Sequence, residues 1–404
     1  MLKLTAHILL TNDFEQYAHR EVYGVTFVER LIRQCKELKV HSINVWSEKI
    51  MFVHSDVYCH PFNEWNQYMS QLRVREEERI IIIDSNIIAD DRLIKYLGNH
   101  TDSLAITNQY HIVGVNTSRL VKNNIDVFSF ETAKKYVANF DPKVIEPNEM
   151  NKYVHELRLQ FVPYFFVYTH ALDIRQMQNI MYEANFKGTL DFIATYVYKY
   201  PVREITKLLS RHPWVTPDFI TVLSIASSFA VPLLLAFGEM GWAVLVGWLM
   251  FIFDSVDGKL ARLTVRLNPT MGVIEHATSA PAIFLWFAGL GWYFSNGQLL
   301  EFTHPASATA WSLMALYWLD KGVNGIFKPR FGIDLYNYAP IDRFFHLFAC
   351  RRAIIHLIIT LGWATGYRDE AFYFLGIWMV ISFMFHLFRC GWILATDEPQ
   401  TVAE

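Results

Sequence analysis

The chain has 404 residues, of which 52% are hydrophobic and 16% aromatic, and its formal net charge is -3. This hydrophobic fraction is high for a soluble protein and indicates that part of the chain is buried in lipid. A slightly acidic chain whose soluble stretches have no excess of Lys and Arg is not a nucleic-acid-binding protein, because contacts to phosphates need such an excess. The apolar residues concentrate after about position 214, so a soluble region followed by a membrane region is predicted.

The first 150 residues are predicted to form an α/β domain. Short β-rich runs at 4–12, 41–47, 79–86, 103–107 and 111–116 alternate with helical stretches such as 25–40. Strands that alternate with helices favour a mostly parallel sheet with helices on its faces. The start of the chain has too short an apolar run for a secretory signal and is predicted as the first strand.

This strand and helix order, with a hydrophobic strand ending in Asp84, is similar to sugar-nucleotide and inositol-phosphate nucleotidyltransferase domains. The resemblance implies a metal-binding role for Asp84, and an ordinary turn residue at the end of a strand is the alternative. The glycine-rich loop of that family is missing, because residues 11–24 offer only Gly24, too late to cradle a triphosphate with backbone N–H groups. A degenerate domain with a binding or structural role is therefore expected.

Residues 151–213 are predicted as a linker and a juxtamembrane amphipathic helix. Residues 198–214 alternate apolar and basic side chains at helical spacing, which suits a helix in the cytoplasmic interface of a membrane. An ordinary linker helix is the alternative.

Six membrane spans are predicted in residues 214–395, and residues 396–404 are expected to be a C-terminal tail. A hydrocarbon core of about 30 Å needs roughly 20 apolar residues per helix. The predicted spans cover about 217–238, 240–255, 272–295, 305–319, 353–366 and 371–392. Basic residues cluster before the first span, between the second and third, and between the fourth and fifth. The positive-inside rule therefore places both termini in the cytoplasm.

Two acidic residues, Asp254 and Asp257, lie at the cytoplasmic end of the second predicted span. Ionised groups at that depth are costly and are functional candidates. At i, i+3 spacing both carboxylates project from one helix face, where they can share a divalent cation bound through oxygens. The alternative is a cluster of solvated charges at a helix end, paired with Lys259 and Arg262.

The run D-x-x-D-G-x-x-A-R, present as Asp254, Asp257, Gly258, Ala261 and Arg262, resembles the first half of the CDP-alcohol phosphotransferase signature. The resemblance implies a membrane enzyme that moves a phospho-alcohol from a CDP carrier to a hydroxyl acceptor and releases CMP, in phospholipid or polar-lipid synthesis. It also implies six membrane helices, Mg²⁺ or Mn²⁺ as cofactor, a site at the cytoplasmic helix ends, homodimers, and most commonly a bacterial inner membrane. Gly258 and Ala261 leave room for the nucleotide, and Arg262 supplies a forked cation for phosphate.

The start of the first span supports this resemblance. Thr216, Pro217 and Thr221 resemble the T-P-N-x-x-T start of the family's first membrane helix, with Asp218 in place of Asn. Thr216 is therefore expected to contribute to the CDP site. Further upstream, the run with Lys187, Gly188 and Asp191 resembles a K-x-x-D-G-type stretch that precedes the membrane domain in fused phosphotransferases.

The second half of the signature departs from the family. The family's signature continues with a Gly, a metal-binding Asp and a last Asp that acts as general base. An alignment without a gap places Met271, Glu275 and Ser279 at these three positions. An alignment with one inserted residue places Gly272, His276 and Ala280 there. Glu275 offers oxygens to a metal, and Glu275 or His276 could accept the acceptor's proton. The structural alternatives are an acid that complements a helix dipole and a buried histidine. The missing last Asp also motivates a second hypothesis, a catalytically impaired pseudoenzyme that serves as a membrane scaffold or subunit.

The four cysteines, Cys35, Cys59, Cys350 and Cys390, lack the paired spacing of a zinc site. Neither a metal cluster nor a disulfide framework is expected from them.

Overall fold

The computed structural model describes residues 3–48, 54–74, 78–119, 126–154, 157, 159–169, 172–186 and 188–396. The chain divides into two compact units. The first comprises Met1–Phe186, Ser210–Pro213 and Ala261–Leu267, and the second comprises Lys187–Leu209, Trp214–Leu260 and Asn268–Glu404. The domain boundaries drawn from the sequence at 150 and 213 stay predictions.

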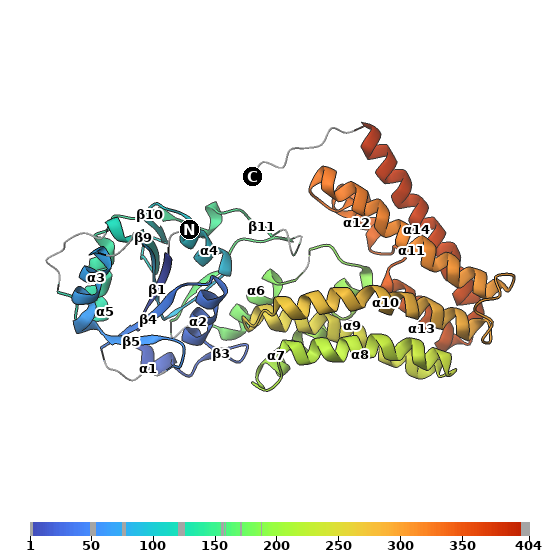
Figure 1. Ribbon diagram of the computed structural model, residues 1–404, viewed down its shortest axis with the longest axis horizontal. Helices are drawn as coiled ribbons and strands as arrows, with labels where there is room; N and C mark the ends of the chain where they lie inside the picture. The colour runs from blue at the N-terminus through green and yellow to red at the C-terminus, as the bar shows by residue number, and fades with distance from the viewer. Residues whose placement is uncertain are drawn as a thin grey trace. The chain divides into compact units, whose positions relative to one another are not determined.

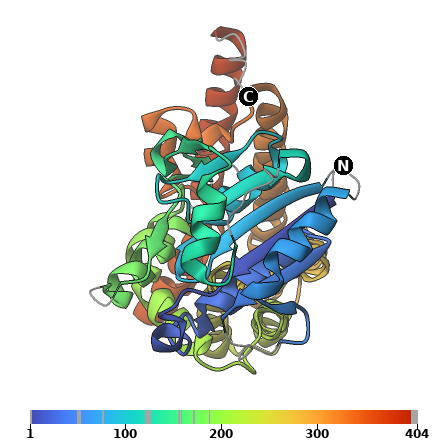
Figure 2. The ribbon, with the colours of Figure 1, turned by 90° about the vertical axis from the view of Figure 1, so that its left-hand side faces the viewer.

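The first unit contains a mixed sheet whose described part has seven strands in the order β10-β8-β9-β6-β1-β4-β5 (Figures 1 and 2). The strands are β1 (Lys3–Leu9), β4 (Ser42–Ser47), β5 (Tyr58–Pro61), β6 (Glu78–Asp84), β8 (Leu104–Ile106), β9 (Ile112–Asn116) and β10 (Lys143–Ile145). Their pairings are parallel except at β9, which runs antiparallel to β6 and β8. The predicted α/β fold with a mostly parallel sheet is confirmed.

Helices cover both faces of this sheet (Figure 1). The helices α2 (Phe27–Glu37) and α4 (Asp91–Asn99) share one apolar core with β1 and β6, and α3 (Trp65–Val74) and α5 (Phe130–Ala138) share another on the opposite face. The predicted helix at 25–40 is confirmed as α2, which begins where the Thr26 side chain accepts a hydrogen bond from the N–H of Glu29. All four cysteines are free.

Short elements complete the first unit. They are α1 (Phe14–Tyr17), β2 (Glu21–Val22), β3 (Val25–Thr26), β7 (Ile87–Ala89), β11 (Tyr153–Val154), β12 (Leu159–Gln160), β13 (Phe165–Val167) and α6 (Ile174–Ala184). They form three antiparallel pairs, β2 with β3, β7 with β13, and β11 with β12.

The second unit is helical. After a short π-helical turn at Ile193–Val197, its helices are α7 (Lys199–Ser210), α8 (Pro217–Ala236), α9 (Met240–Leu263), α10 (Pro269–Phe294), α11 (Pro305–Phe331), α12 (Pro340–His346), α13 (Arg352–Thr365) and α14 (Arg368–Thr396). The last residue of α7 and the last three of α9 belong to the first unit. The predicted helix over 198–214 is present as α7, and its place in the membrane interface stays a prediction.

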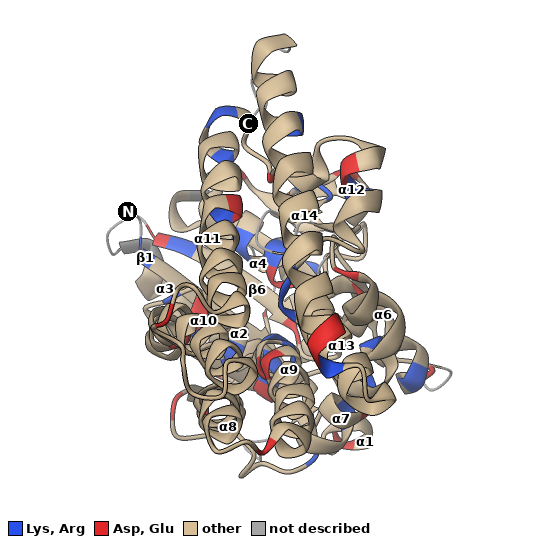
Figure 3. Cartoon of the chain, turned by 90° about the vertical axis from the view of Figure 1, so that its right-hand side faces the viewer, with Lys and Arg blue, Asp and Glu red and all other residues tan. Residues whose placement is uncertain are grey.

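Four helices among the described residues, α8, α9, α10 and α14, are long and apolar enough to cross a membrane. In the most apolar 18-residue stretch of each of these helices, only 22 to 39% of the residues are buried within the protein. Large apolar side chains such as Leu233, Ile377 and Phe388 therefore remain exposed. In Figure 3 charged residues are sparse along these helices. Such surfaces need lipid around them, which identifies a multi-pass membrane protein.

The predicted number of six spans is not confirmed. The predicted span at 305–319 lies in α11, whose apolar part gives way to Asp320 and Lys321 before the helix ends. The predicted span at 353–366 corresponds to α13, which has 14 residues, fewer than the roughly 20 that a straight crossing needs.

Local sequence fixes where two of the membrane helices begin. The Thr216 side chain caps α8 by accepting from the N–H of Phe219 at 3.2 Å, and Pro217 follows as the first helical residue. Asn268 caps α10 by accepting from the N–H groups of Thr270 and Met271. Because of this cap, α10 begins at Pro269, three residues before the predicted start.

Candidate functional site

Asp257 is the most enclosed acidic residue of the candidate site. Its side chain lies on α9 in a residue that is only 4% exposed. The Thr221 hydroxyl of α8 donates a hydrogen bond to Oδ2 at 2.9 Å, and the backbone N–H of Gly258 lies 2.5 Å from Oδ1. A buried carboxylate needs such donors to offset its desolvation. These two donors therefore hold the Asp257 carboxylate in one orientation.

Asp254 lies one helical turn earlier on α9 and faces a cation from another helix. Arg352, the first residue of α13, places its Nη2 3.8 Å from Asp254 Oδ2, and both side chains are about one-third exposed. A carboxylate that is accessible and opposite a single arginine retains oxygen lone pairs for a ligand. The two acids thus differ in exposure, because Asp257 is buried and Asp254 is accessible.

Glu275 and His276 lie in different surroundings on α10. Glu275 is half-buried, and its charge acts on both Asp257 and Arg352. His276 is exposed, and its Nδ1 lies 2.8 Å from the carbonyl oxygen of Gly272. Of the two predicted candidates, Glu275 is therefore the one whose charge acts on Asp257 in the described structure.

The donor chemistry of these acids fits a hard divalent cation. In the described part of the chain, no three His, Cys, Asp or Glu side chains are arranged to hold a metal ion, so the predicted trio of Asp254, Asp257 and Glu275 does not form a closed cage. Mg²⁺ is commonly bound by one or two carboxylates, with substrate phosphates and water as its other ligands. Asp254 and Asp257, each with oxygen lone pairs to spare, fit that kind of open site.

The residues predicted to contact CDP lie at the start of α8 and in the second half of α9. Gly258 and Ala261 are half-buried on α9, and the side chain of Thr216 serves as the helix cap described above. Arg262 belongs to the first unit, where its Nη2 lies 3.5 Å from the carbonyl oxygen of Asn185. Their roles in nucleotide binding stay predictions.

The Asp84 carboxylate is already paired with two side chains of its own domain. The Asp84 side chain is 2% exposed at the end of β6, and its Oδ2 lies 2.7 Å from His111 Nδ1 and 2.9 Å from Lys134 Nζ. The metal-binding role implied by the nucleotidyltransferase resemblance would require displacing these partners. Asp191 accepts a hydrogen bond from the N–H of Ala194 at 2.9 Å, and Lys187 lies outside the described residues.

Sequence reasoning did not single out Arg352, Asp320 or His386. Arg352 was counted only as part of a basic loop. Asp320 follows directly after a predicted span and His386 lies within one, and ionisable residues at such positions are functional candidates by default. That signal would have identified the Asp320 and His386 pair, whose Oδ1 and Nδ1 atoms are 2.6 Å apart.

Comparison with known proteins gives one family match. The family model described as CDP-alcohol phosphatidyltransferase matches residues 214–272, and no curated protein matches the chain. Two similar solved structures are those of Mycobacterium tuberculosis phosphatidylinositol phosphate synthase (PgsA1), one with CDP-DAG bound and one in complex with manganese and citrate. Each is 17% identical with a TM-score of 0.38, and the matches cover 50% of this chain and 97% and 92% of those chains.

A TM-score of 0.38 is too low to establish a common fold, so the likeness to this family rests on the matched segment. That segment holds α8, α9 and the start of α10, with Asp254, Asp257 and Thr221. The resemblance predicted from the sequence is thereby confirmed for residues 214–272, which match the CDP-alcohol phosphatidyltransferase family model.

Proposed function

We propose that this protein is a membrane CDP-alcohol phosphotransferase, which transfers a phospho-alcohol from a CDP carrier to a hydroxyl acceptor, releases CMP and makes a phospholipid or another polar lipid. The observation that carries the proposal is the pair Asp254 and Asp257, one helical turn apart on α9, within the segment that matches the family. Thr221 from α8 orients Asp257 by a hydrogen bond, so two helices contribute to the arrangement of these acids.

The proposed metal ligands are Asp254 and Asp257, with Glu275 close enough to contribute charge. A bound Mg²⁺ or Mn²⁺ would neutralise charge on the pyrophosphate and make CMP a better leaving group. The Thr221 hydroxyl and the Gly258 N–H hold the Asp257 carboxylate in one orientation, which supports this role. Arg352 offsets part of the mutual repulsion of the acids, because it faces Asp254 at 3.8 Å.

The proposal is tested with the purified full-length protein, a panel of CDP-alcohols and hydroxyl acceptors, and Mg²⁺ or Mn²⁺. We expect CMP release that a chelator abolishes and that Asp257→Asn lowers at least about 100-fold, since losing a few kcal/mol of transition-state stabilisation has that effect. Asp369→Asn is the matched control, because Asp369 is an exposed acid at the start of α14. CMP release that is equal in the wild type and Asp257→Asn across the panel would exclude this activity.

The same measurements separate the enzyme from the scaffold hypothesis. Binding of CDP-alcohol without turnover, together with co-purification of a second protein, would identify a pseudoenzyme. Turnover by the isolated chain would exclude it.

We also propose that the cytoplasmic side of the membrane contains both termini and this site. The support is the distribution of basic residues over alternate loops, which follows the positive-inside rule. A reporter that is active only outside the cytoplasm is fused to the C-terminus. Activity of this fusion would show that the orientation is the opposite one.

A further inference from the structure

A cavity of about 620 Å³ lies in the α/β domain, on the face of the sheet that α3 covers. Its walls include, from four strands and this helix, Thr5 of β1, Asn44 of β4, His60 of β5, Glu78 of β6 and Tyr68 of α3. These strand residues lie in the amino-terminal parts of parallel strands, whereas Asp84 lies at the carboxyl end of β6. The cavity is therefore separate from the position that the nucleotidyltransferase resemblance implies for a metal. Its volume is sufficient for a small metabolite.

Three buried N–H donors on this face of the sheet have no hydrogen-bond partner among the residues that the structure describes. They are His7 Nε2, Asn44 Nδ2 and Trp65 Nε1, and none of these residues is more than 2% exposed. Asn44 lines the cavity. His7 is the direct neighbour of Asn44 in the pairing of β1 with β4, and the ring centroids of His7 and Trp65 are 5.9 Å apart. Buried donors without an acceptor are costly, so three neighbouring ones indicate an acceptor from outside the chain.

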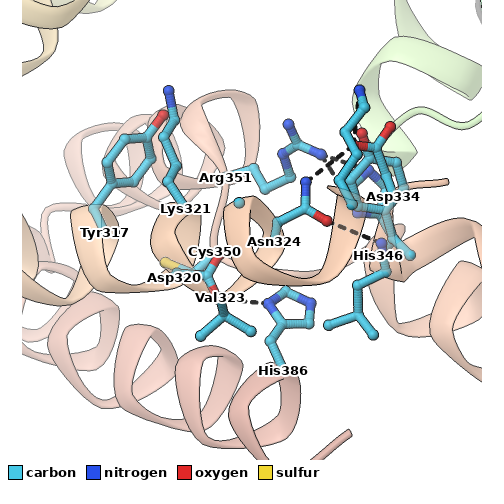
Figure 4. Close-up of a pocket in the computed structure, with 14 residues that line it drawn as sticks. Tyr317, Asp320, Lys321, Val323, Asn324, Asp334, His346, Cys350, Arg351 and His386 are labelled. Carbon is cyan, nitrogen blue, oxygen red and sulfur yellow. Dashed lines mark hydrogen bonds and ion pairs between the residues drawn. The ribbon is translucent and has the colours of Figure 1, made fainter. Parts of the chain in front are cut away.

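The polar cavity of the helical unit, shown in Figure 4, is of a different kind. The side chains that line it include donors and acceptors that pair with one another, as Asn324 does with Asp334 and His386 does with Asp320. The cavity of the α/β domain instead has unpaired groups of one kind beside it, all of them N–H donors. A ligand of acceptor character is therefore expected in the α/β domain.

Printed contacts of His7 and Asn44 establish which of their atoms donate. Trp46 Nε1 donates to His7 Nδ1 at 2.9 Å, so the neutral ring carries its hydrogen on Nε2. Burial lowers the pKa of His7 from 6.5 to about 3, so the ring is neutral near pH 7. His60 Nε2 lies 3.1 Å from Asn44 Oδ1, so the oxygen of this amide is already an acceptor. One hydrogen on His7, one on Trp65 and two on Asn44 thus give four N–H hydrogens without a described acceptor.

The chemistry of these donors favours a carboxylate. A sugar or polyol hydroxyl would bring its own hydrogen, and the two nearby acceptors, His7 Nδ1 and Asn44 Oδ1, are already occupied. A neutral carbonyl oxygen has only two lone pairs, whereas the two oxygens of a carboxylate offer about four sites, which match four hydrogens. Hydrogen bonds from N–H groups to a carboxylate are strong and stabilise its charged form even when it is buried.

The outer end of the cavity contains an acceptor for the rest of the ligand. Glu78 is 6% exposed, and its Oε2 accepts a hydrogen bond from the Thr5 hydroxyl at 3.3 Å. In the sheet Glu78 pairs with Lys3, four residues before His7 and so about 13 Å away along the strand. This separation limits the repulsion between Glu78 and a carboxylate bound beside His7. The remaining lone pairs of Glu78 suit a hydroxyl or an amine.

We propose that this cavity binds a small carboxylic acid that also carries a hydroxyl or an amine. Its carboxylate accepts from the three buried N–H donors, and its hydroxyl or amine donates to Glu78. The inference goes beyond the proposed function and does not rest on it, because every residue of this site belongs to the first unit. Binding makes and breaks no covalent bond.

The first experiment measures binding of small acids to the full-length protein near pH 7 by ligand-detected NMR. The probes are lactate, β-alanine, γ-aminobutyrate, ε-aminocaproate and para-hydroxybenzoate, with their neutral amides and inorganic phosphate for comparison. Asp257→Asn serves as the background in metal-free buffer, so that carboxylates held by a metal at the α9 acids do not contribute. We expect at least one acid to bind, its amide to bind at least tenfold more weakly, and phosphate not to compete. Equal binding of acid and amide, competition by phosphate, or no binding of any acid overturns the proposal.

The second experiment locates the binding with variants in the same background. Asn44→Leu removes one donor group and should weaken binding of the acid at least tenfold, because hydrogen bonds to a charged group are strong. Trp65→Phe removes another donor and should also weaken binding, which provides the same test in a second variant. Asn99→Leu is the matched control, because Asn99 is exposed at the end of α4 on the opposite face of the sheet. Urea unfolding verifies that each variant is folded, and binding by both donor variants as tight as that of Asn99→Leu excludes this site.

The third experiment tests the outer end. Glu78→Gln should weaken binding of an amine-bearing acid more than binding of a hydroxyl-bearing acid, because only the amine loses an attraction between charges. Glu37→Gln is the control, since Glu37 is an exposed acid at the end of α2. If Glu78→Gln and Glu37→Gln bind every acid equally well, Glu78 does not contact the ligand and the proposed orientation is wrong.

Discussion

Arg30 on α2 donates a hydrogen bond from Nη2 to the carbonyl oxygen of Leu263, the last residue of α9, 233 positions along the chain. The same Nη2 donates to the carbonyl of Val22 at 3.2 Å, and Arg33 donates to the carbonyl of Thr264 at 2.7 Å. The last carbonyls of a helix lack donors within the helix, and a cation at that end is favourable. The helix that presents the two acids thus ends on arginines of the α/β domain, within the first unit.

The first prediction concerns this capping. Arg30 is 1% exposed, so Arg30→Met leaves buried carbonyls without their donor and should lower the free energy of unfolding of the first unit by about 1–3 kcal/mol. Pulse proteolysis of the full-length protein in a urea series measures the change. Arg33→Met is the comparison, because Arg33 is more accessible and is shared with Glu29, and its effect should be smaller. An equal or larger loss in Arg33→Met would contradict the prediction.

The second prediction concerns Thr221 and Asp257. Thr221→Val keeps the shape of the side chain but removes the donor to Oδ2 of Asp257. Hydrogen bonds to charged groups contribute about 1.5–3 kcal/mol, so metal-dependent CMP release should fall about ten- to hundredfold. Thr221→Ser keeps the hydroxyl and should retain most of the activity. If Val and Ser are tolerated equally, Thr221 does not orient the carboxylate.

The third prediction concerns Asp84, whose carboxylate lies against His111 and Lys134. Asp84→Asn should lower the free energy of unfolding of the α/β domain by about 1–3 kcal/mol, because Lys134 then loses its carboxylate partner. The double variant Asp84→Asn with Lys134→Met should be less destabilised than the sum of the two single variants. CTP and pyrophosphate exchange should be absent in the wild type, and exchange that requires Asp84 would show instead that it binds a nucleotide-associated metal.

The α/β fold was predictable because its central strands are continuous apolar runs, as in β6, where residues 80–83 are four isoleucines. The edge strand β10 was missed because three residues, Lys143–Ile145, carry too little periodic signal. The predicted number of spans is not confirmed, in part because the apolar run at 305–319 continues as helix through Asp320 and Lys321. Hydropathy reports composition and does not report where a helix ends.

The site was predictable only where it is local. Asp254 and Asp257 lie on one helix, so their spacing along the chain fixes their common face. The contacts of Asp254 with Arg352 and of Asp320 with His386 join different helices, and the packing that pairs those helices has no signature in a single sequence. Polar residues within apolar helices were the available signal.

The fourth prediction concerns pH and His7, which is fully buried in β1 and accepts a hydrogen bond from Trp46 Nε1 at 2.9 Å. Burial, and secondarily the charge of His60, lowers the pKa of His7 from 6.5 to about 3. Between these values the unfolded chain binds the proton and the folded chain does not, so stability falls as the pH drops through 6.5 toward about 3.

At pH 5 the resulting loss should be about 2 kcal/mol relative to pH 7.5. His7→Asn keeps an acceptor for Trp46 but does not titrate, so its pH dependence should be weaker by that amount. Urea titrations of both proteins at the two pH values, with unfolding of the α/β domain read by pulse proteolysis, give the comparison. Identical pH dependences would mean that His7 is protonated in the folded state.

The fifth prediction separates the two alignments of the signature on α10. One alignment places Glu275 and Ser279 at the acidic positions, and both are half-buried, whereas the other places His276 and Ala280, and both are exposed. Since the charge of Glu275 acts on Asp257, Glu275→Gln should weaken the activation of CMP release by Mn²⁺ about tenfold or more. His276→Gln should have a smaller effect, because its ring faces solvent and the carbonyl of Gly272. Mn²⁺ titrations of CMP release for the two variants decide between the alignments, and a larger effect of His276→Gln would select the alignment with the inserted residue.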